Sequence, residues 1–301
     1  MEISESSKTM NNHIRCFQFI FTSAAFALLG LSLAAPQTQA RAEEQAQSQT
    51  QSGSDKVSVK LSDPARPALV KAGLISGGIT VKAYEGKEVV VEARVRNRES
   101  GRSDSGPKRL SISTTGLTVE EENNEININT ESFARAIDLQ ISVPVHTSLH
   151  LRAVNDGDIV VSGVDGELDI DNVNGSVTLN NIAGSTVAHA LNGRLLVTFT
   201  RVNQKPMAFS SLNGDIDVTF PADLKANVSL RSDRGDVFSD FDVQMQASAS
   251  QPIVEDSRGH GGKYRVKIDK TVRGSINGGG PEFQFTNFNG QIYIRKSGGP
   301  R

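Results

Sequence analysis

The stretch VNDGDIVVSGVDGELDIDNVNGSVTLNNIAGSTVAHALNGRLLV, residues 154–197, repeats one short phrase. Its glycines recur at a nine-residue spacing, with apolar or small residues on both sides: Gly157, Gly166, Gly175, Gly184 and Gly193. A fixed period of this kind dictates the architecture of a whole domain. The repeat therefore predicts an all-β fold, a β-solenoid of short stacked strands, and disfavours an enzyme domain built around a pocket.

A longer template includes the residues before each glycine. In one copy, alternate side chains face one way before the chain turns: Leu168, Ile170, Val173, Gly175, Val177 and Leu179. The template recurs around Gly214 and Gly290, and more weakly around Gly235, where Asp233 takes the apolar position. Two nine-residue phrases add up to 18 residues, and the later glycines Gly193, Gly214 and Gly235 are 21 residues apart. These spacings predict coils of roughly 18–21 residues with either two or three sides.

The chemistry of the turn explains the glycines. Glycine accepts a positive φ without steric cost, and a preceding Asn or Asp tolerates turn conformations. Most of the preceding positions hold asparagine: Asn174, Asn192, Asn213 and Asn289. Each inward aliphatic side chain contributes about 1.5–3 kcal/mol when buried, and a single coil cannot close a core alone.

Additional strands are expected at the N-terminal end of the solenoid. Residues 79–84 and 89–95 flank a short polar connection, which predicts a hairpin. Alternating apolar residues predict further strands near residues 110–113, 117–119, 126–128 and 137–143. Pro144 should end the last of these, because proline cannot donate to a ladder.

Later in the chain, two segments depart from the repeat. The polar, Gly/Ser-rich residues 244–262 predict an excursion loop, and residues 278–281 a tight turn. The sequence Gly274–Gly280 lacks the Gly-Lys-Ser/Thr ending of a phosphate-binding loop. A turn between strands is therefore the better interpretation of it.

Four segments organise the chain. They are an export signal in residues 1–40, a disordered Gln/Ser-rich linker in 41–56, the solenoid domain in 57–296 and a flexible tail in 297–301. His13 and Arg15 precede an apolar run that ends near small residues suited to cleavage. The run could also stay as an anchor. Both alternatives place the domain outside the cytoplasm, and the single Cys16 leaves the mature chain without disulfides.

Charge balance restricts the class of partner. The 301 residues include 32 basic and 34 acidic side chains, whereas a nucleic-acid-binding domain carries a basic surplus on one face. A cell-surface protein or an envelope polysaccharide is the expected partner. Binding to nucleic acid is not expected. No membrane span is expected in the mature chain.

Acidic residues spaced two apart are the strongest chemical candidates. They are expected on the outward face: Asp156, Asp158, Glu167, Asp169, Asp171, Asp215 and Asp217. Carboxylate pairs can serve glycoside chemistry or bind calcium, but the calcium-roll pattern GGxGxDxUx is absent and outward carboxylates also keep a sheet soluble. We therefore predict no catalytic, cofactor-binding or metal site.

Histidines and outward apolar residues are two further sets of candidates. The histidines show no ligand spacing: His146, His150, His189 and His260. Several apolar residues fall on outward positions and are candidates for an interaction surface: Val160, Val187, Leu196, Phe238 and Tyr293.

The phrases VPVHTSLHLRAVNDGDIVVSGVDGELDIDNVNGSVTL, SLNGDIDVTFPADL, SDRGDVFSD and INGGGPEFQFTNFNGQIYIRK together resemble the bacterial putative-adhesin family, whose domains have β-helical repeats and unknown function. The resemblance covers residues 57–296 and implies an exported, surface-associated solenoid. It carries no catalytic residues. This chain departs from the family in its long linker and in the loop around residues 251–262.

A non-catalytic, exported, adhesin-like protein that presents a repetitive surface is the leading hypothesis. The alternative is a polysaccharide-active β-helix enzyme, a lyase or hydrolase, that uses carboxylates such as Asp158, Asp169 and Asp217. The absence of Trp and the three Tyr disfavour it, since sugar-processing grooves gather aromatic platforms. A sensor or regulatory partner in the envelope is a third hypothesis.

Overall fold

A computed structural model describes residues 54–96, 115–131, 135–246 and 271–298, with the backbone alone at 253–256 and 264–267. All of them lie in one compact unit, Gln47–Arg301. Within these ranges every regular element is a strand, and none is an apolar helix able to cross a membrane. The predicted signal, most of the linker, the expected strand at 110–113 and His260 lie outside them. The first strand, β1 (Ser54–Lys60), starts slightly before the predicted domain boundary at Val57.

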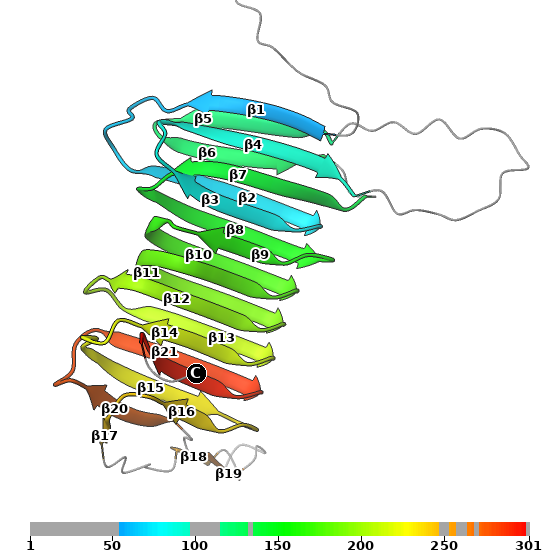
Figure 1. Ribbon diagram of the computed structural model, residues 1–301. Coiled ribbons are helices and arrows are strands. Elements are labelled where there is room, and N and C mark those ends of the chain that lie inside the picture. Colours follow the sequence, from blue (N-terminus) through cyan, green and yellow to red (C-terminus); the bar gives the residue numbers. More distant parts are fainter. Residues whose placement is uncertain are drawn as a thin grey trace, which may run out of the picture. The chain divides into compact units, whose positions relative to one another are not determined.

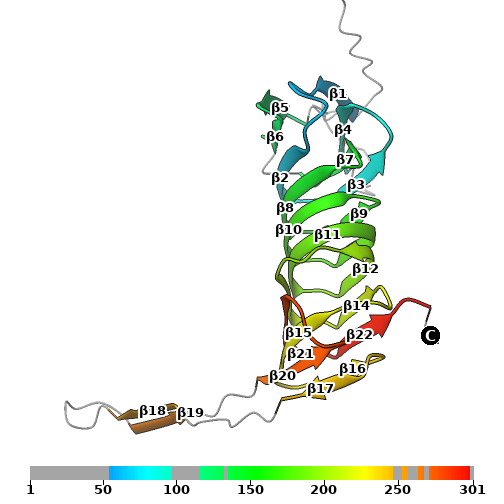
Figure 2. The ribbon, with the colours of Figure 1, turned by 90° about the vertical axis from the view of Figure 1, so that its left-hand side faces the viewer.

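Parallel strands stack in two facing layers (Figures 1 and 2). Face A contains, in spatial order, β6 (Glu125–Thr130), β2 (Ala68–Ser76), β8 (Thr147–Asn155), β10 (Asp165–Asn174), the second half of β11 (Val177–Asn192), β13 (Met207–Asn213), β21 (Glu282–Asn289) and β15 (Ala226–Ser232). Face B contains β7 (Ile137–Pro144), β3 (Ile79–Tyr84), β9 (Ile159–Ser162), the first half of β11, β12 (Leu195–Val202), β14 (Ile216–Phe220), β22 (Ile292–Lys296) and β16 (Val237–Ser239). One face A strand and the face B strand that follows it form a rung. The predicted all-β, solenoid-like fold is confirmed.

Antiparallel strands lie at both ends of the stack. At one end, β4 (Glu88–Val95) pairs with β7 and β1 pairs with β4, while β5 (Leu117–Glu122) pairs with β6. At the other end, β20 (Val272–Ile276) pairs with β15 and β17 (Val243–Met245) pairs with β20. These strands cover edges that would otherwise be free to pair with another chain.

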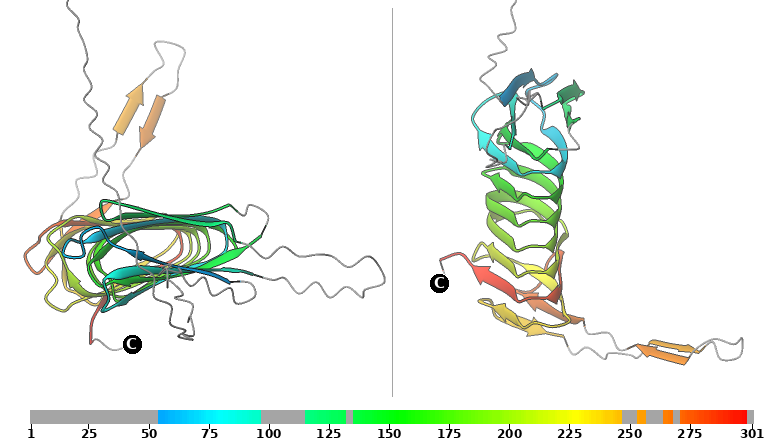
Figure 3. Two further views of the ribbon diagram at one scale, coloured as in Figure 1. Left: turned by 90° about the horizontal axis from the view of Figure 1, so that it is seen from above. Right: turned by 90° about the vertical axis from the view of Figure 1, so that its right-hand side faces the viewer.

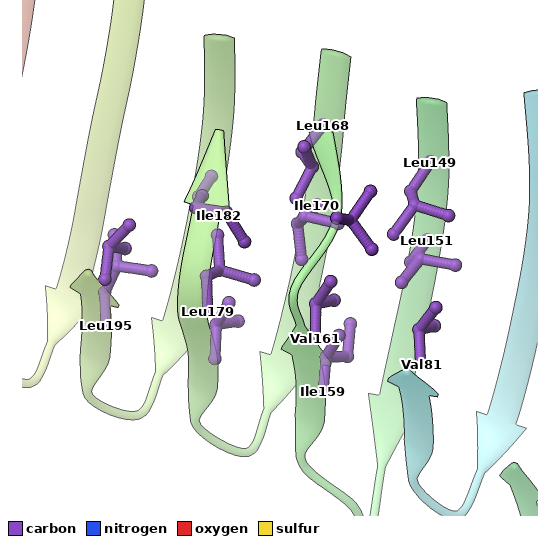
Figure 4. Packing of buried hydrophobic residues seen from close by; sticks show 14 of the residues in the cluster. Val81, Leu149, Leu151, Ile159, Val161, Leu168, Ile170, Leu179, Ile182 and Leu195 are labelled. Carbon is purple, nitrogen blue, oxygen red and sulfur yellow. The ribbon is translucent and has the colours of Figure 1, made fainter. Parts of the chain in front are cut away.

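Alternation along each strand builds the core between the two faces (Figure 4). Leu149 and Leu151 on β8 face Ile159 and Val161 on β9, and all four side chains are at most 1% exposed. Toward the C-terminal rungs the core becomes aromatic, with the Phe209 and Phe285 rings stacked at 5.1 Å. Figure 3 shows the two layers end-on, facing each other.

Glycines form columns where the chain passes from one face to the other. One column contains Gly77, Gly157, Gly175, Gly193, Gly214, Gly290 and Gly235, and a second column, at the opposite corner, contains Gly166 and Gly184. A Cβ built on Gly193 would lie 2.1 Å from the carbonyl oxygen of Gly175. Gly214 (φ +151°) also needs a positive φ, whereas Gly193 does not. Close backbone approach between rungs is therefore the common reason for glycine, and left-handed conformation is an additional one.

The asparagines before these glycines have a role that the sequence analysis missed. Among the described residues, none of Asn174, Asn192, Asn213 and Asn289 has a positive φ. Their side chains form a ladder along the corner: Asn174 Nδ2 donates to Asn155 Oδ1 (2.9 Å), Asn192 to Asn174 (2.9 Å), Asn213 to Asn192 (2.8 Å) and Asn289 to Asn213 (3.4 Å). Such ladders hold stacked strands in register.

Replacing one ladder donor tests this role. Asn192→Asp removes the donor and sets a carboxylate oxygen against Asn174 Oδ1, so the free energy of unfolding should fall by about 1 kcal/mol. Denaturant unfolding measures the change. Asn180→Asp, which adds the same charge on face B outside the ladder, is the control. Equal losses in the two variants would contradict the ladder.

Sequence order and spatial order differ at both ends of the stack. The rung β2–β3 lies between β6–β7 and β8–β9, although both of these follow it in the chain. The final rung, β21–β22, lies between β13–β14 and β15–β16. Each end of the chain therefore supplies an interior rung, which neighbouring rungs cover on both sides.

Two local predictions were wrong. The expected hairpin of residues 79–84 with 89–95 does not form, because β7 lies between β3 and β4 and pairs with both. The hairpin signal is local, whereas burial of the alternating residues of β7 depends on distant partners. The expected loop at residues 244–262 contains the end of β17 and also β18 (Ile253–Asp256), which pairs with β19 (Tyr264–Lys267). The expected turn at residues 278–281 is confirmed.

Candidate functional site

A groove of about 760 Å³ crosses successive rungs on the outside of face A, beside the longer glycine column. Its floor is the backbone of a row of buried residues that includes Ala153, Ala190 and Ser211. One wall is a polar row and the other an apolar row, because residues on either side of an inward position point outward. We call this the outer groove.

Cross-strand pairing sets the polar wall. Its members are neighbours in register: Arg152, Asp171, His189, Ser210, Thr286 and Arg231. Arg152 Nε lies 3.4 Å from Asp171 Oδ2, and His189 Nδ1 is hydrogen-bonded to Ser210 Oγ. The wall thus offers both charges and neutral hydrogen-bonding groups.

The apolar wall consists of the residue two positions before the glycine in most rungs. Its members are Val154, Val173, Leu191, Leu212 and Phe288. Leu191, Leu212 and Phe288 are 43%, 40% and 41% exposed, which is high for side chains of this size. The guanidinium of Arg234 lies over the Phe288 ring at 5.3 Å.

This wall was missed in the sequence, although a signal for it was present. The template counted Val173 among the apolar positions that build the core. Val173 follows the inward Ile170 by an odd number of residues, so strand alternation places it on the opposite side. The structure shows Ile170 fully buried and Val173 at the groove.

A second groove of about 660 Å³ lies on face A beside the shorter glycine column. Contacts between polar side chains line it: His150 Nδ1 lies 3.0 Å from Asp169 Oδ2, and Lys205 Nζ forms an ion pair with Glu167 Oε1. Val187 also lines it. Because four of its outward residues are polar side chains in contact with one another, it offers less free apolar surface than the outer groove.

Four of the predicted outward apolar residues lie on face B. Val160, Leu196, Tyr293 and Phe238 fall in one register row, interrupted by Thr178 and Asp217. Val187 lies apart from them on face A. The rings of Phe238 and Tyr293 stack at 5.1 Å, so the structure brings together one aromatic pair rather than a continuous stripe.

A charge pair borders these rings. The hydrogen bond from Arg295 Nε to Asp217 Oδ1 (2.7 Å) raises the pKa of Arg295 above its usual range. The same guanidinium lies 4.8 Å from the centre of the Tyr293 ring. Asp217 is therefore occupied in orienting a neighbour.

The carboxylates considered for catalysis do not meet. Asp158 lies at the glycine corner, where Oδ1 accepts a hydrogen bond from the Ser176 amide at 2.7 Å. Asp169 lies on face A and Asp217 on face B. A carboxylate pair for glycoside cleavage must flank one bond, and these three residues flank none in common.

The other acidic candidates also have partners. Glu167 contacts Lys205, Asp171 pairs with Arg152, and Asp215 Oδ1 accepts a hydrogen bond from the Gln291 amide. Asp156 accepts a hydrogen bond from Ser76 Oγ at 3.2 Å. Across the described part of the chain, no group of three or more His, Cys, Asp or Glu side chains is arranged to hold a metal ion.

The fold and this surface define an all-β, solenoid-like repeat protein with a groove on one face. Residues 148–277 match the family model described as Toastrack DUF4097. The predicted resemblance to a family of domains of unknown function is confirmed for these residues. No curated protein matches the chain.

Two solved structures are similar over most of their length. One is described as a putative cell adhesion protein from Clostridium sporogenes ATCC 15579, with 10% identity, a TM-score of 0.33, and 81% of this chain and 100% of that chain covered. The other is described as a putative adhesin from Bacteroides fragilis NCTC 9343, with 12% identity, a TM-score of 0.33, and coverage of 82% and 98%.

Proposed function

We propose that this chain is a non-catalytic, exported, adhesin-like protein that presents a repetitive surface to a cell-surface or envelope partner. The outer groove is the contact surface in this proposal. It supports the function because one apolar wall and one polar wall continue across adjacent rungs. A partner lying along the stack would meet an apolar side chain at the same place in most rungs, opposite a polar side chain that differs from rung to rung.

The repeating unit of this surface is proposed to be a coil of 18–21 residues. Three of the four bonds in the asparagine ladder support that length, since they join residues 18, 19 or 21 positions apart. The fourth, from Asn289 to Asn213, joins residues 76 positions apart, because β21–β22 comes from a later part of the chain. Many weak contacts at regular intervals add up to useful avidity. An extracytoplasmic location follows from the predicted export signal.

The location of the candidate carboxylates supports a non-catalytic role. The enzyme alternative required outward carboxylates near one another, and Asp158, Asp169 and Asp217 lie at a corner and on opposite faces. No observation in the described residues favours that alternative over surface binding.

Changing the apolar wall tests the proposal. The triple change Leu191→Ser, Leu212→Ser and Phe288→Ser should weaken binding to immobilised envelope polysaccharide or to a surface-protein fraction by about 100-fold, while each single change should cost less than about tenfold. Surface plasmon resonance with the mature protein measures both.

Leu196→Ser, on face B, is the matched control, because Leu196 is exposed to a similar extent. It should leave binding unchanged. Unaltered binding by the triple variant would overturn the assignment of the groove. Complete loss from one single change would contradict the repetitive mode of contact.

A further inference from the structure

Asn–Gly dipeptides occur in two different settings in this fold. Four of them lie in the glycine column: Asn174–Gly175, Asn192–Gly193, Asn213–Gly214 and Asn289–Gly290. The fifth, Asn277–Gly278, forms the turn between β20 and β21. Asparagine is among the chemically labile residues. A glycine that follows it has no Cβ to shield the asparagine side chain from attack by the glycine nitrogen.

We propose that Asn277 is a site of spontaneous covalent modification, and that the stack protects the asparagines of the column from the same reaction. The Gly278 nitrogen loses its proton and bonds to Asn277 Cγ, while the Cγ–Nδ2 bond breaks and Nδ2 takes up a proton to leave as ammonia. Water then opens the resulting succinimide and gives aspartate or isoaspartate. Water is the only co-reactant.

In the interior of the column both reacting groups are held. The attacking nitrogens donate hydrogen bonds to the next rung: Gly175 to Asn192 O (3.2 Å), Gly193 to Asn213 O (2.9 Å) and Gly214 to Asn289 O (3.1 Å). The leaving amides donate along the ladder. Ring closure there must break both bonds, and neighbouring backbone packs against each glycine.

The turn lacks this protection. Asn277 and Gly278 are exposed, and a Cβ on Gly278 would meet nothing within 4 Å. No acceptor among the described residues receives the Gly278 N–H. One restraint remains, the hydrogen bond from Asn277 Nδ2 to Leu224 O at 2.7 Å. Asn277 therefore needs fewer bonds broken than the column residues.

Asn289 is less well protected than the interior asparagines of the column but better protected than Asn277. Its Nδ2 makes the longest bond of the ladder, 3.4 Å, and no described acceptor receives the Gly290 N–H. Gly290 is nevertheless packed against the carbonyl of Gly214, where an added Cβ would lie 2.4 Å from the oxygen. The expected order of reaction is Asn277, then Asn289, then the three interior asparagines.

Peptide mapping by mass spectrometry tests this order. The full-length folded protein is aged in mildly alkaline buffer, and a second sample is aged in concentrated urea. In the folded sample, Asn277 should be converted at least about tenfold faster than Asn174, Asn192 and Asn213, a ratio that one additional hydrogen bond can produce. In urea all five should react at similar rates.

Asn277→Gln is the matched variant, because the longer side chain disfavours the five-membered ring. Its aged peptide should keep its amide, while the rate at Asn289 is unchanged. Similar rates at Asn277 and the interior asparagines of the folded protein would overturn the proposal. So would resistance of Asn277 in the folded protein together with conversion in urea.

Discussion

Gly193→Val is expected to lower the free energy of unfolding by about 4 kcal/mol or more, enough to unfold many domains. The added Cβ alone would lie 2.1 Å from the oxygen and 2.5 Å from the carbon of the Gly175 carbonyl. These are backbone atoms, so no side chain can rotate away. The rungs would have to separate, and inward residues such as Leu195 would lose contacts above and below. Thermal and urea unfolding measure the loss.

Gly73→Ala is the matched control for this prediction. Gly73 lies in β2, and a Cβ built there meets nothing within 4 Å. Its change should alter stability by less than about 0.5 kcal/mol, as expected at an unconstrained surface position. A small effect at Gly193 would show that the rungs can move apart at little cost. It would contradict the inference that close backbone approach between rungs requires glycine in the column.

Ending the chain after Gly280 is expected to unfold the C-terminal part of the stack. The truncation removes β21–β22 and with it Phe283, Phe285, Ile292 and Ile294, each at most 1% exposed. Burial of each contributes about 1.5–3 kcal/mol, and the sum is comparable with the whole stability of a typical domain. Hydrogen exchange should show lost protection in β13 and β15, which both pair with β21.

A chain that ends after Gly298 provides the control. It keeps the hydrogen bond from Ser297 N to Phe220 O (2.8 Å) and should exchange like the full chain. If the shorter protein kept β15 protected, β15 would have re-paired directly with β13, and the inserted rung would be dispensable for folding.

Alternation and the glycine period were sufficient to predict the general class of fold. Both signals are local, so Leu168 and Ile170 could be assigned to the core from neighbouring residues alone. The order of the rungs could not be predicted in this way. Placing β21–β22 between β13–β14 and β15–β16 depends on how distant surfaces fit, for example Phe285 against Phe209, and no spacing encodes that choice.

The outer groove was less predictable than the fold. Outward apolar residues were considered singly, and Val160, Leu196, Phe238 and Tyr293 were found on face B. The apolar wall of face A was overlooked because the core template included Val173, the residue two positions before the glycine. Strand alternation would have separated Val173 from the inward Ile170. The sequence could not show that the candidate carboxylates lie apart, because the turns between Asp169 and Asp217 decide that they lie on different faces.

The interior position of the last rung has a consequence for the order of synthesis. A ribosome releases β13–β14 and β15–β16 before β21–β22 exist, yet these two rungs do not pair with each other in the finished protein. A nascent chain therefore carries two unpaired β-edges until β21–β22 has been synthesised. During that interval the edges can recruit strands from other chains, so the demand for chaperones should be highest between the synthesis of β15–β16 and that of β21–β22.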